Sequence, residues 1–373
     1  MRKVRHAVIG VGIMGKGHAK IAHEIDEMEL VAIADVNEGL ARSVGEEFKV
    51  KWYTDYIEML EREKPDSVSI CTPHFLHRDM AIEVAKRGIH VLVEKPIAIS
   101  VKEADDMIKT ARKSGVKLGV VFQHRFTEKY RKLRELIVEQ GTLGDLLFAS
   151  LEYFCYRSQP YYNMARWRGT WKYEGGGVLI NQAIHFIDLF QWIIGIMPKR
   201  VAAFSGTLLH KIEVEDVAAA SLDFENGAKG TLSAASISEP SYIRMRVQGD
   251  RGAVYFEHKM DKESATIAFF SPPIKEAMFM TTDVPWGLTP EVEEDVLILP
   301  DIKGGHEAAL RDFARAIIED KEPAIPGEEG LKSLEIVNAI ILSSFKGSPV
   351  EIPVNREEYE KVLSKLRCKG ELK

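Results

Sequence analysis

Residues 4–15 read VRHAVIGVGIMG, and this stretch decides the fold of the N-terminal part of the chain. Residues 4–9 predict a short buried strand, and the apolar spacing of residues 18–25 predicts a helix. Between them, Gly10, Gly12 and Gly15 form the pattern G-x-G-x-x-G. Glycines at these positions permit a tight turn, approach of a pyrophosphate to the backbone, and close packing of helix on strand. The stretch therefore predicts a dinucleotide-binding turn, with phosphates at the helix N-terminus.

A carboxylate at the end of the next predicted strand supports this interpretation. Asp35 closes the strand 30–35, where an acidic side chain accepts hydrogen bonds from the adenosine ribose hydroxyls. The same charge repels a 2′-phosphate, and Val36 and Asn37 bring no positive charge. We therefore expect NAD rather than NADP as the cofactor. The residues of this region predicted to contact it are Gly10, Gly12, Ile13, Met14, Gly15 and Asp35.

Strands and helices alternate up to about residue 123. Further strands are predicted over 67–71, 90–93 and 118–122, and helices over 38–48, 54–62, 77–87 and 101–114. Strands separated by single helices and short connections are typical of a parallel, doubly wound sheet with helices on both faces. We therefore predict an α/β domain of the Rossmann type over residues 1–123.

The rhythm changes in the second part of the chain, residues 124–373. A helix over 128–139 and a strand over 146–154 precede an aromatic loop, 156–172, and a helix over 177–194. Successive strands are then predicted, followed by two helices and a charged helical tail: 200–210, 216–224, 228–236, 241–248, 252–257, 305–319, 328–345 and the tail from Arg356. Runs of strands joined by turns favour an α+β domain with a large, open, mostly antiparallel sheet.

Composition excludes several classes of function. The net charge of -6 gives no basic field for nucleic acid, and no apolar run approaches the ~20 residues of a membrane span. The three cysteines are odd in number and match no zinc motif, which favours a reducing, cytoplasmic location. No cluster of ligand residues has metal spacing, so we predict no metal. His306 is interpreted as a helix-capping or packing residue.

Three further motifs carry a family resemblance: Thr72-Pro73-His74-x-x-His77, Glu94-Lys95-Pro96, and Gly175-Gly176-Gly177-x-x-x-Asn181-x-x-x-His185-x-x-Asp188. Together with the glycine turn, they resemble the glucose–fructose oxidoreductase/inositol dehydrogenase/MocA family over nearly the whole chain. The resemblance implies an N-terminal Rossmann domain, a C-terminal domain built on a large open sheet, and homo-dimers or homo-tetramers formed through that sheet.

The resemblance also implies roles for individual residues. Lys95, at the carboxyl end of a strand, is the implied catalytic lysine, and its bond to Pro96 is expected to be cis. Asn181, His185 and Asp188 share one helix face. The family commonly has aspartate where this chain has Asn181, which cannot accept a proton and can only orient the substrate hydroxyl or the His185 ring. Whether Lys95 or His185, whose unperturbed pKa is ~6.5, takes the proton stays open.

The loop 156–172 indicates the substrate. Its arginines and aromatic rings suit an anion and a sugar or base ring. Trp167-Arg168 resembles a family dipeptide near the nicotinamide, and the string Trp-Arg-Gly-Thr-Trp with Glu-Gly-Gly-Gly resembles NAD-dependent nucleotide-sugar 3-dehydrogenases acting on UDP-N-acetylglucosamine or its uronic acid. Further cofactor contacts are assigned to Thr72, Pro73, His77, Glu94, Lys95, Gln123, Trp167 and Arg168. Substrate contacts are assigned to Lys95, Arg125, Arg157, Tyr161, Tyr162, Arg168, Asn181 and His185.

The sequence thus predicts an NAD-dependent oxidoreductase that oxidises a secondary hydroxyl of a sugar, foremost C3 of a nucleotide sugar. A myo-inositol-type 2-dehydrogenase and an NADP(H)-linked sugar reductase stay open within the same family. A protein that senses dinucleotides without catalysis is the alternative of another class, although it would have no use for both Lys95 and His185. Two residue-level alternatives also stay open: the loop 156–172 packing on a neighbouring subunit, and Arg125 as a strut between the domains.

Overall fold

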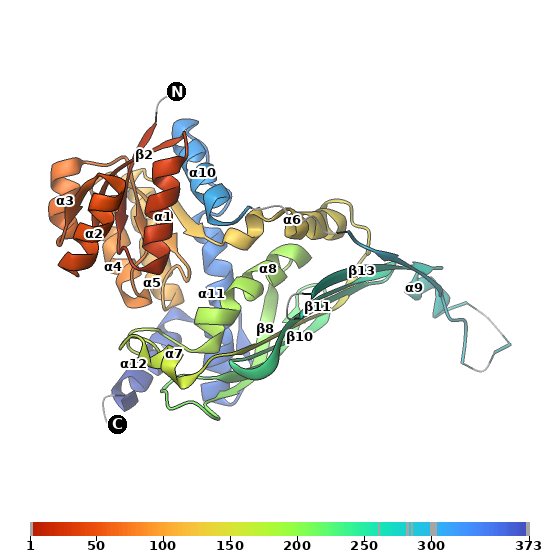
Figure 1. Ribbon diagram of the computed structural model, residues 1–373. Helices are drawn as coiled ribbons and strands as arrows, with labels where there is room; N and C mark the ends of the chain where they lie inside the picture. The colour runs from red at the N-terminus through yellow and green to blue at the C-terminus, as the bar shows by residue number, and fades with distance from the viewer. Residues whose placement is uncertain (1–2, 260–261, 281–282, 285, 299–303, 371–373) are drawn as a thin grey trace.

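The computed structural model describes residues 3–259, 262–280, 283–284, 286–298 and 304–370. Its first sheet has six strands in the order β3-β2-β1-β4-β5-β6, and every pairing is parallel (Figure 1). The strands are β1 Val4–Ile9, β2 Met28–Ala34, β3 Lys51–Tyr53, β4 Ser67–Ile70, β5 His90–Glu94 and β6 Leu118–Val121. The doubly wound parallel sheet is thereby confirmed. The strand β3 was not predicted, because three residues are too few to show an alternating pattern.

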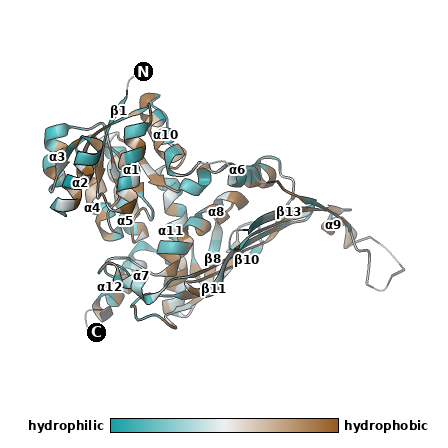
Figure 2. Cartoon of the chain, in the orientation of Figure 1, coloured by the Kyte–Doolittle hydropathy of each residue, from teal (hydrophilic) through white to brown (hydrophobic). Residues whose placement is uncertain are grey.

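Five helices flank this sheet: α1 Ile13–Glu24, α2 Glu38–Phe48, α3 Tyr56–Glu63, α4 His77–Lys86 and α5 Val101–Ser114. Asn37, Asp55 and Ser100 cap α2, α3 and α5 with side-chain oxygens that accept backbone N–H bonds. Helix α1 begins five residues earlier than predicted, and its N-cap, Gly12, has no side chain to accept. The outward surfaces of α2 and α3 are polar in Figure 2, as expected of helices that cover a sheet.

The second sheet has nine strands in the order β14-β13-β12-β11-β7-β10-β9-β8-β15. Only β7 and β10 run parallel; the other pairings are antiparallel, which confirms the predicted sheet. The strands are β7 Leu146–Tyr156, β8 Pro198–Gly206, β9 Val217–Phe224, β10 Lys229–Ala235, β11 Ile237–Gly249, β12 Gly252–Lys259, β13 Lys262–Ser271, β14 Glu291–Val296 and β15 Val350–Glu351. The last three were not predicted.

The helices of this part are α6 Glu128–Arg134, α7 Gln159–Asn163, α8 Ile184–Ile194, α9 Ile274–Ala277, α10 Gly305–Ile318, α11 Gly327–Lys346 and α12 Arg356–Gly370. Two expectations were wrong in detail. The loop 156–172 contains α7, and α8 is preceded by a π-helical turn over Leu179–Ala183 instead of beginning at residue 177. Helices α8 and α11 pack on one face of the second sheet, and α10 returns to pack against α1.

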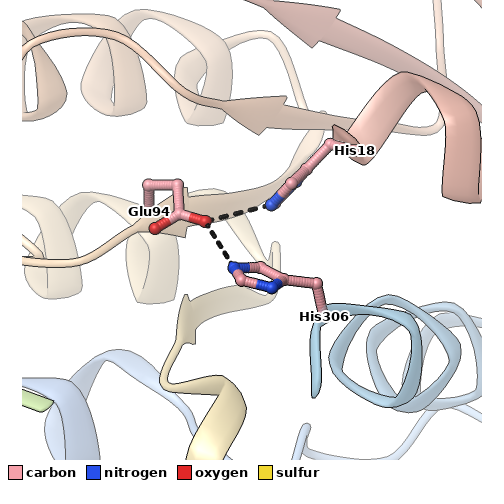
Figure 3. Close-up of side chains that lie close together, drawn as sticks. All are labelled: His18, Glu94 and His306. Carbon is pink, nitrogen blue, oxygen red and sulfur yellow. Dashed lines mark hydrogen bonds and ion pairs between the residues drawn. The ribbon is translucent and has the colours of Figure 1, made fainter. Parts of the chain in front are cut away.

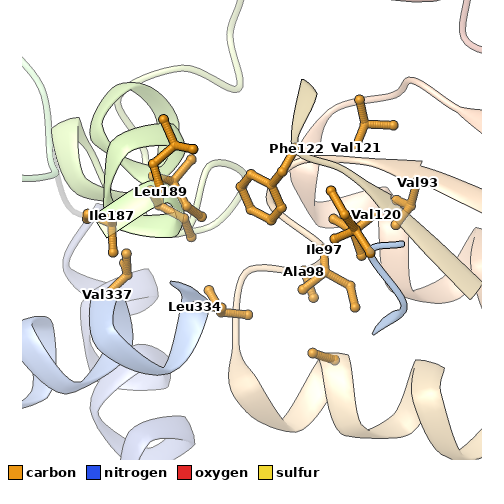
Figure 4. Close-up of a cluster of buried hydrophobic side chains, with 14 of the residues drawn as sticks. Val93, Ile97, Ala98, Val120, Val121, Phe122, Ile187, Leu189, Leu334 and Val337 are labelled. Carbon is orange, nitrogen blue, oxygen red and sulfur yellow. The ribbon is translucent and has the colours of Figure 1, made fainter. Parts of the chain in front are cut away.

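A hydrophobic core joins the two sheets. Phe122, just after β6, lies among side chains of the first sheet on one side and of α8 and α11 on the other (Figure 4). Phe122, Ile187, Leu189, Leu334 and Val337 are all fully buried or nearly so. This packing holds α8 in a fixed position opposite the carboxyl ends of the parallel strands, where the site lies.

Candidate active site

A cavity of about 500 Å³ lies at the carboxyl ends of β1, β2, β4 and β5. This position is the switch point of the parallel sheet, where such folds bind ligands. Its wall combines the glycine turn with residues of the second half of the chain. The predicted site residues that line it are Gly10, Gly12, Ile13, Met14, Asp35, Thr72, Pro73, Glu94, Lys95, Trp167, Arg168 and Asn181.

The glycine turn fits a dinucleotide. A Cβ atom added to Gly15 would lie 1.8 Å from the Gly10 carbonyl oxygen, so only glycine permits this contact between helix and strand. A Cβ on Gly12 would meet nothing within 4 Å, which leaves the first N–H groups of α1 accessible to phosphate. Ile13 and Val36 are 86% and 91% exposed, and a bound dinucleotide would cover such apolar side chains at the rim.

Asp35 is fixed by the backbone around it. Its Oδ2 accepts a hydrogen bond from the N–H of Val11 at 2.9 Å, and its Oδ1 accepts one from Asn37 at 2.9 Å. The carboxylate thus stands at the edge of the cavity beside the glycine turn, where the ribose of a bound adenosine would meet its negative charge.

Lys95 lies where the two halves of the chain meet. Its Nζ donates a hydrogen bond to the backbone carbonyl oxygen of Asn181 at 2.9 Å, and the Lys95–Pro96 bond is cis, as predicted. Burial lowers the pKa of the lysine; the Glu94 charge opposes this shift and Arg168 adds to it. A lysine with a lowered pKa is more readily available as the neutral amine, which can accept a proton.

Two side chains contact the Asn181 amide. Its Nδ2 contacts the Glu174 carboxylate and lies 3.4 Å from the Tyr161 hydroxyl. The same hydroxyl accepts hydrogen bonds from Arg168 at 2.5 Å and from Gln182 at 3.1 Å. Glu174 was not assigned a role from the sequence. The only signal was its place before Gly175 to Gly177, which does not reveal that its side chain reaches Asn181.

His185 is not among the residues that line the cavity. Its ring packs against His124 at 5.3 Å and Phe122 at 6.4 Å, and its Nδ1 is buried without a hydrogen-bond partner among the described residues. Burial, together with the charge of Lys95, holds the pKa of His185 well below its ordinary value. The imidazole is therefore neutral at neutral pH, which differs from the expectation built on an unperturbed histidine.

Arg125 does not face the cavity, and its assignment as a substrate contact is corrected. Its guanidinium donates to both carboxylate oxygens of Asp188, at 2.8 and 2.7 Å, and to Glu329 at 3.0 Å. The side chains of Arg125 and Asp188 are 4% and 1% exposed. Arg125 is thus the strut that the sequence left open as an alternative, because its donors are already used inside the protein.

Several other predicted contacts also lie outside the cavity wall. The two ring nitrogens of His77 face the carbonyl oxygens of Pro96 and Thr72, each at 2.8 Å, so this histidine braces the two loops of the cavity. The hydroxyl of Tyr162 is hydrogen-bonded to Ser236 at 3.0 Å in the interior, which makes it a packing residue. Gln123 and Arg157 are not among the residues that line the cavity.

Glu94 forms a cluster with two histidines, His18 and His306 (Figure 3). Glu94 Oε1 lies 3.0 Å from Nε2 of His18 and 3.5 Å from Nε2 of His306, and Nδ1 of His18 continues to Ser69 at 3.0 Å. Sequence spacing could not reveal this cluster, because its members come from α1, β5 and α10. Its contacts keep the pKa of Glu94 well below the ordinary value, despite burial. His306 thus contacts Glu94 in addition to beginning α10.

Positive charge gathers on the loop 156–172. Among the residues that the structure describes, Arg157, Arg166 and Arg168 have no carboxylate within ion-pair distance. Arg168 lies over the rings of Tyr161 and Trp167, with its guanidinium carbon 4.4 and 4.5 Å from the ring centroids. A guanidinium on the cavity wall without an anionic partner is available to a bound anion.

These features define a class of protein: an enzyme that uses a nicotinamide dinucleotide and has a lysine amine beside its cofactor site. Two family models match the chain, "Oxidoreductase family, NAD-binding Rossmann fold" over residues 4–122 and "Oxidoreductase family, C-terminal alpha/beta domain" over residues 134–352. The chain belongs to the glucose–fructose oxidoreductase/inositol dehydrogenase/MocA family of NAD(P)-dependent sugar oxidoreductases, which act on CH–OH groups.

Its relatives differ in substrate. The scyllo-inositol 2-dehydrogenase (NAD(+)) of Bacillus subtilis is 28% identical over 95% of this chain and 98% of its own length. The D-glucoside 3-dehydrogenase of Escherichia coli is 30% identical over 68% of this chain and 77% of its own. The crystal structure of the WlbA dehydrogenase from Bordetella pertussis with NADH and UDP-GlcNAcA has a TM-score of 0.80 at 29% identity, covering 95% of this chain and all of that one. In the described part of this chain, no helix is long and apolar enough to cross a membrane.

Proposed function

We propose that this protein is an NAD-dependent dehydrogenase that oxidises C3 of a UDP-linked hexose. The observation that carries the proposal is the position of Arg168: its guanidinium lies on the wall that also presents Lys95, and no described carboxylate pairs with it. A neutral polyol offers nothing to neutralise such a charge, whereas the diphosphate or uronate group of a nucleotide sugar does. The likeness to the WlbA dehydrogenase, whose structure contains UDP-GlcNAcA, supports the same substrate class.

In this proposal Lys95 is the base. The bound NAD supplies the hydride acceptor, so the C–H hydrogen leaves the sugar as hydride and the hydroxyl hydrogen leaves as a proton. Burial lowers the pKa of Lys95, which prepares its Nζ to take that proton, and the Asn181 carbonyl oxygen orients the amine. His185, held neutral by its surroundings, assists as a hydrogen-bonding group beside Lys95 and is not the base.

Asp35 supports NAD over NADP as the cofactor, because its fixed carboxylate stands where a 2′-phosphate would approach. We further propose that the protein forms homo-dimers or homo-tetramers through the second sheet and works in the cytoplasm.

The test is a substrate screen that follows nicotinamide absorbance with NAD and UDP-sugars, inositols and free hexoses. We expect turnover of UDP-N-acetylglucosamine or its uronic acid. The variant Arg168→Ala should raise the KM for that substrate by at least about tenfold, because a charge-assisted hydrogen bond contributes ~1.5–3 kcal/mol. The exposed Arg166 offers a matched control, and Arg166→Ala should leave the KM near the wild-type value.

Two outcomes would contradict the proposal. Efficient turnover of scyllo- or myo-inositol without turnover of any UDP-sugar would indicate an inositol-type dehydrogenase. Weaker NADH binding by Arg168→Ala with an unchanged substrate KM would show that the arginine serves the cofactor instead.

A further inference from the structure

Glu174 is a buried carboxylate beside the reaction centre. Its side chain is fully buried just before three glycines, and it meets two donors. The N–H of Gly169 donates to one carboxylate oxygen, and the Nδ2 of Asn181 donates to the other. The first donor is backbone and cannot turn, whereas the second belongs to an amide that can.

The carboxylate decides which end of the Asn181 amide faces the cavity. An ionised carboxylate only accepts hydrogen bonds, so the group facing it is the amide nitrogen, with the Tyr161 hydroxyl as the second acceptor at 3.4 Å. Asn181 lines the cavity beside Lys95, and its Oδ1 accepts no hydrogen bond within the described residues. The amide oxygen is thus the group that Asn181 offers to a ligand.

We propose that Glu174 is a positioning residue, which holds the Asn181 amide so that its Oδ1 accepts a hydrogen bond from a hydroxyl or amide N–H of the substrate next to the oxidised carbon. This inference rests on the proposed oxidation of a sugar at this site. Asn181 would then favour substrates that have a hydrogen-bond donor at this position. A substrate group that can only accept would face the Oδ1 acceptor and form no hydrogen bond.

The surroundings of Glu174 set its pKa, and therefore the pH range in which its carboxylate can hold the Asn181 amide in this orientation. Burial raises the pKa of Glu174 to about 7; the hydrogen bonds from Gly169 and Asn181 and the charge of Arg168 oppose the shift, and Glu215 adds to it. Lys95 and Tyr162 also face it electrostatically. Below about pH 7 the protonated Glu174 carboxyl group donates a hydrogen bond, and its preferred partner on Asn181 becomes Oδ1. The amide then rotates and presents Nδ2 to the cavity. Activity should therefore fall as the pH drops through this range.

The test is Glu174→Gln, assayed with NAD and UDP-N-acetylglucosaminuronic acid. In this variant the Gly169 N–H still donates to the glutamine oxygen, so the glutamine NH₂ faces Asn181. The Asn181 amide must then turn its Oδ1 toward the glutamine and its Nδ2 toward the cavity. We expect kcat/KM to fall by about 10- to 100-fold, the size expected when a buried hydrogen-bonding group loses its partner. The part of the acidic limb near pH 7 that Glu174 contributes should disappear, which leaves the fall caused by protonation of Lys95, while NADH affinity, measured by fluorescence, changes less than about twofold.

A second variant separates positioning from structural damage. In Glu174→Gln combined with Asn181→Asp, the glutamine NH₂ donates to one aspartate oxygen and the other oxygen faces the cavity as an acceptor. This double variant should recover most of the lost kcat/KM, whereas Asn181→Asp alone sets two carboxylates against each other and should be poorer above pH 7. Glu103→Gln is the control, because burial also raises the pKa of that carboxyl group on α5 to about 7 although it does not line the cavity, and this variant should keep the acidic limb.

Two results would overturn the inference: an unchanged kcat/KM and acidic limb in Glu174→Gln, or a double variant no better than the single one although both bind NADH. If the wild-type enzyme ignores UDP-sugars, the proposed substrate is wrong, and the same four variants are compared on the sugar or inositol that the screen returns. The rescue pattern compares variants with one another, so it tests Glu174 separately from the substrate class.

Discussion

Lys95 is the side chain that connects the cofactor half of the cavity with the helix that carries Asn181 and His185. Its amine has one described hydrogen-bond partner, a backbone carbonyl oxygen, and a pKa lowered by burial. We expect Lys95→Ala to reduce turnover by at least ~10²-fold, the lower range for a positioned acid–base group. Single-turnover absorbance at saturating NAD measures this loss.

Lys95→Arg is the matched control, since it keeps a positive charge but cannot act as a base at neutral pH. It should be as inactive as the alanine variant, while both bind NADH normally. Near-normal turnover by either variant would remove Lys95 from the proton transfer and leave His185 as the candidate base.

Asp35 is predicted to decide the choice between the two dinucleotides. Its carboxylate accepts backbone hydrogen bonds from Val11 and Asn37, so it cannot swing away from a 2′-phosphate without breaking them. Asp35→Ser should reduce the ratio of NAD to NADP affinity by at least about tenfold, mainly through tighter NADP binding, since a nearby like charge is removed. Fluorescence titration of both reduced cofactors measures the ratio. A wild-type protein that binds NADPH more tightly than NADH would contradict the assignment.

At the scale of elements, the α8 region forms one side of the site and is tied to the rest of the molecule by buried polar contacts. The π-helical turn before it is held by Glu215, which accepts hydrogen bonds from Gly177 and Leu179 at 2.8 and 3.1 Å. Farther along, Asp188 receives both arms of the Arg125 guanidinium. These partners are distant in sequence, so the helix start could not be predicted from local spacing.

The Arg125–Asp188 pair is expected to be a large stabilising contact. Asp188→Ala leaves a buried guanidinium with Glu329 as its one remaining carboxylate among the described residues, and removing one member of a buried pair costs ~3–5 kcal/mol. Thermal and urea unfolding without cofactor should show this loss. The double variant Arg125→Met with Asp188→Leu should lie much closer to wild type, because neither charge is left unpaired. A destabilisation by Asp188→Ala below about 1 kcal/mol would show that water or another group replaces the carboxylate.

At the scale of the whole molecule, the second sheet has one covered face and one open face. Helices α8 and α11 pack on one side, and no helix in the described part of the chain covers the other (Figure 1). Phe204 on β8 is 82% exposed and Tyr156 at the end of β7 is 54% exposed. At the far end of the sheet, α9 projects from the body (Figure 1). Phe279 and Trp286, which lie between α9 and β14 in the sequence, are both 86% exposed. Exposed aromatic residues in such number are typical of an interface between proteins.

We therefore expect the protein to sediment as a homo-dimer or homo-tetramer. Phe204→Glu should weaken the assembly, because burying an unpaired carboxylate in an interface is costly, and light scattering coupled to gel filtration should show a smaller mass. Lys113→Glu, on the exposed side of α5, is the control and should leave the mass unchanged. A wild-type protein that is monomeric at micromolar concentration would contradict the expected assembly.

The sequence determined the parallel sheet and the cofactor turn, because both depend on local rules, whereas the role predicted for Lys95 came from the family resemblance. Gly10 has a positive φ of 81°, a Cβ on Gly15 would collide with the Gly10 carbonyl oxygen, and Asp35 follows at the end of the next strand. The alternation of strands and helices is visible in hydrophobic spacing alone. The strand β14 was missed in the same analysis, since it is exposed along its whole length and has no buried face to give a pattern.

Only the tertiary structure decided the surroundings of these residues. It showed that Glu174 contacts Asn181 and that Arg125 pairs with Asp188 instead of lining the cavity. It also showed that Tyr162 bonds to Ser236 and that His18, Glu94 and His306, from three elements, lie together. It also lowered the pKa of His185 through burial. A side chain's partners and pKa depend on which distant segments exclude water around it, and the spacing of residues along the chain carries no direct record of that packing.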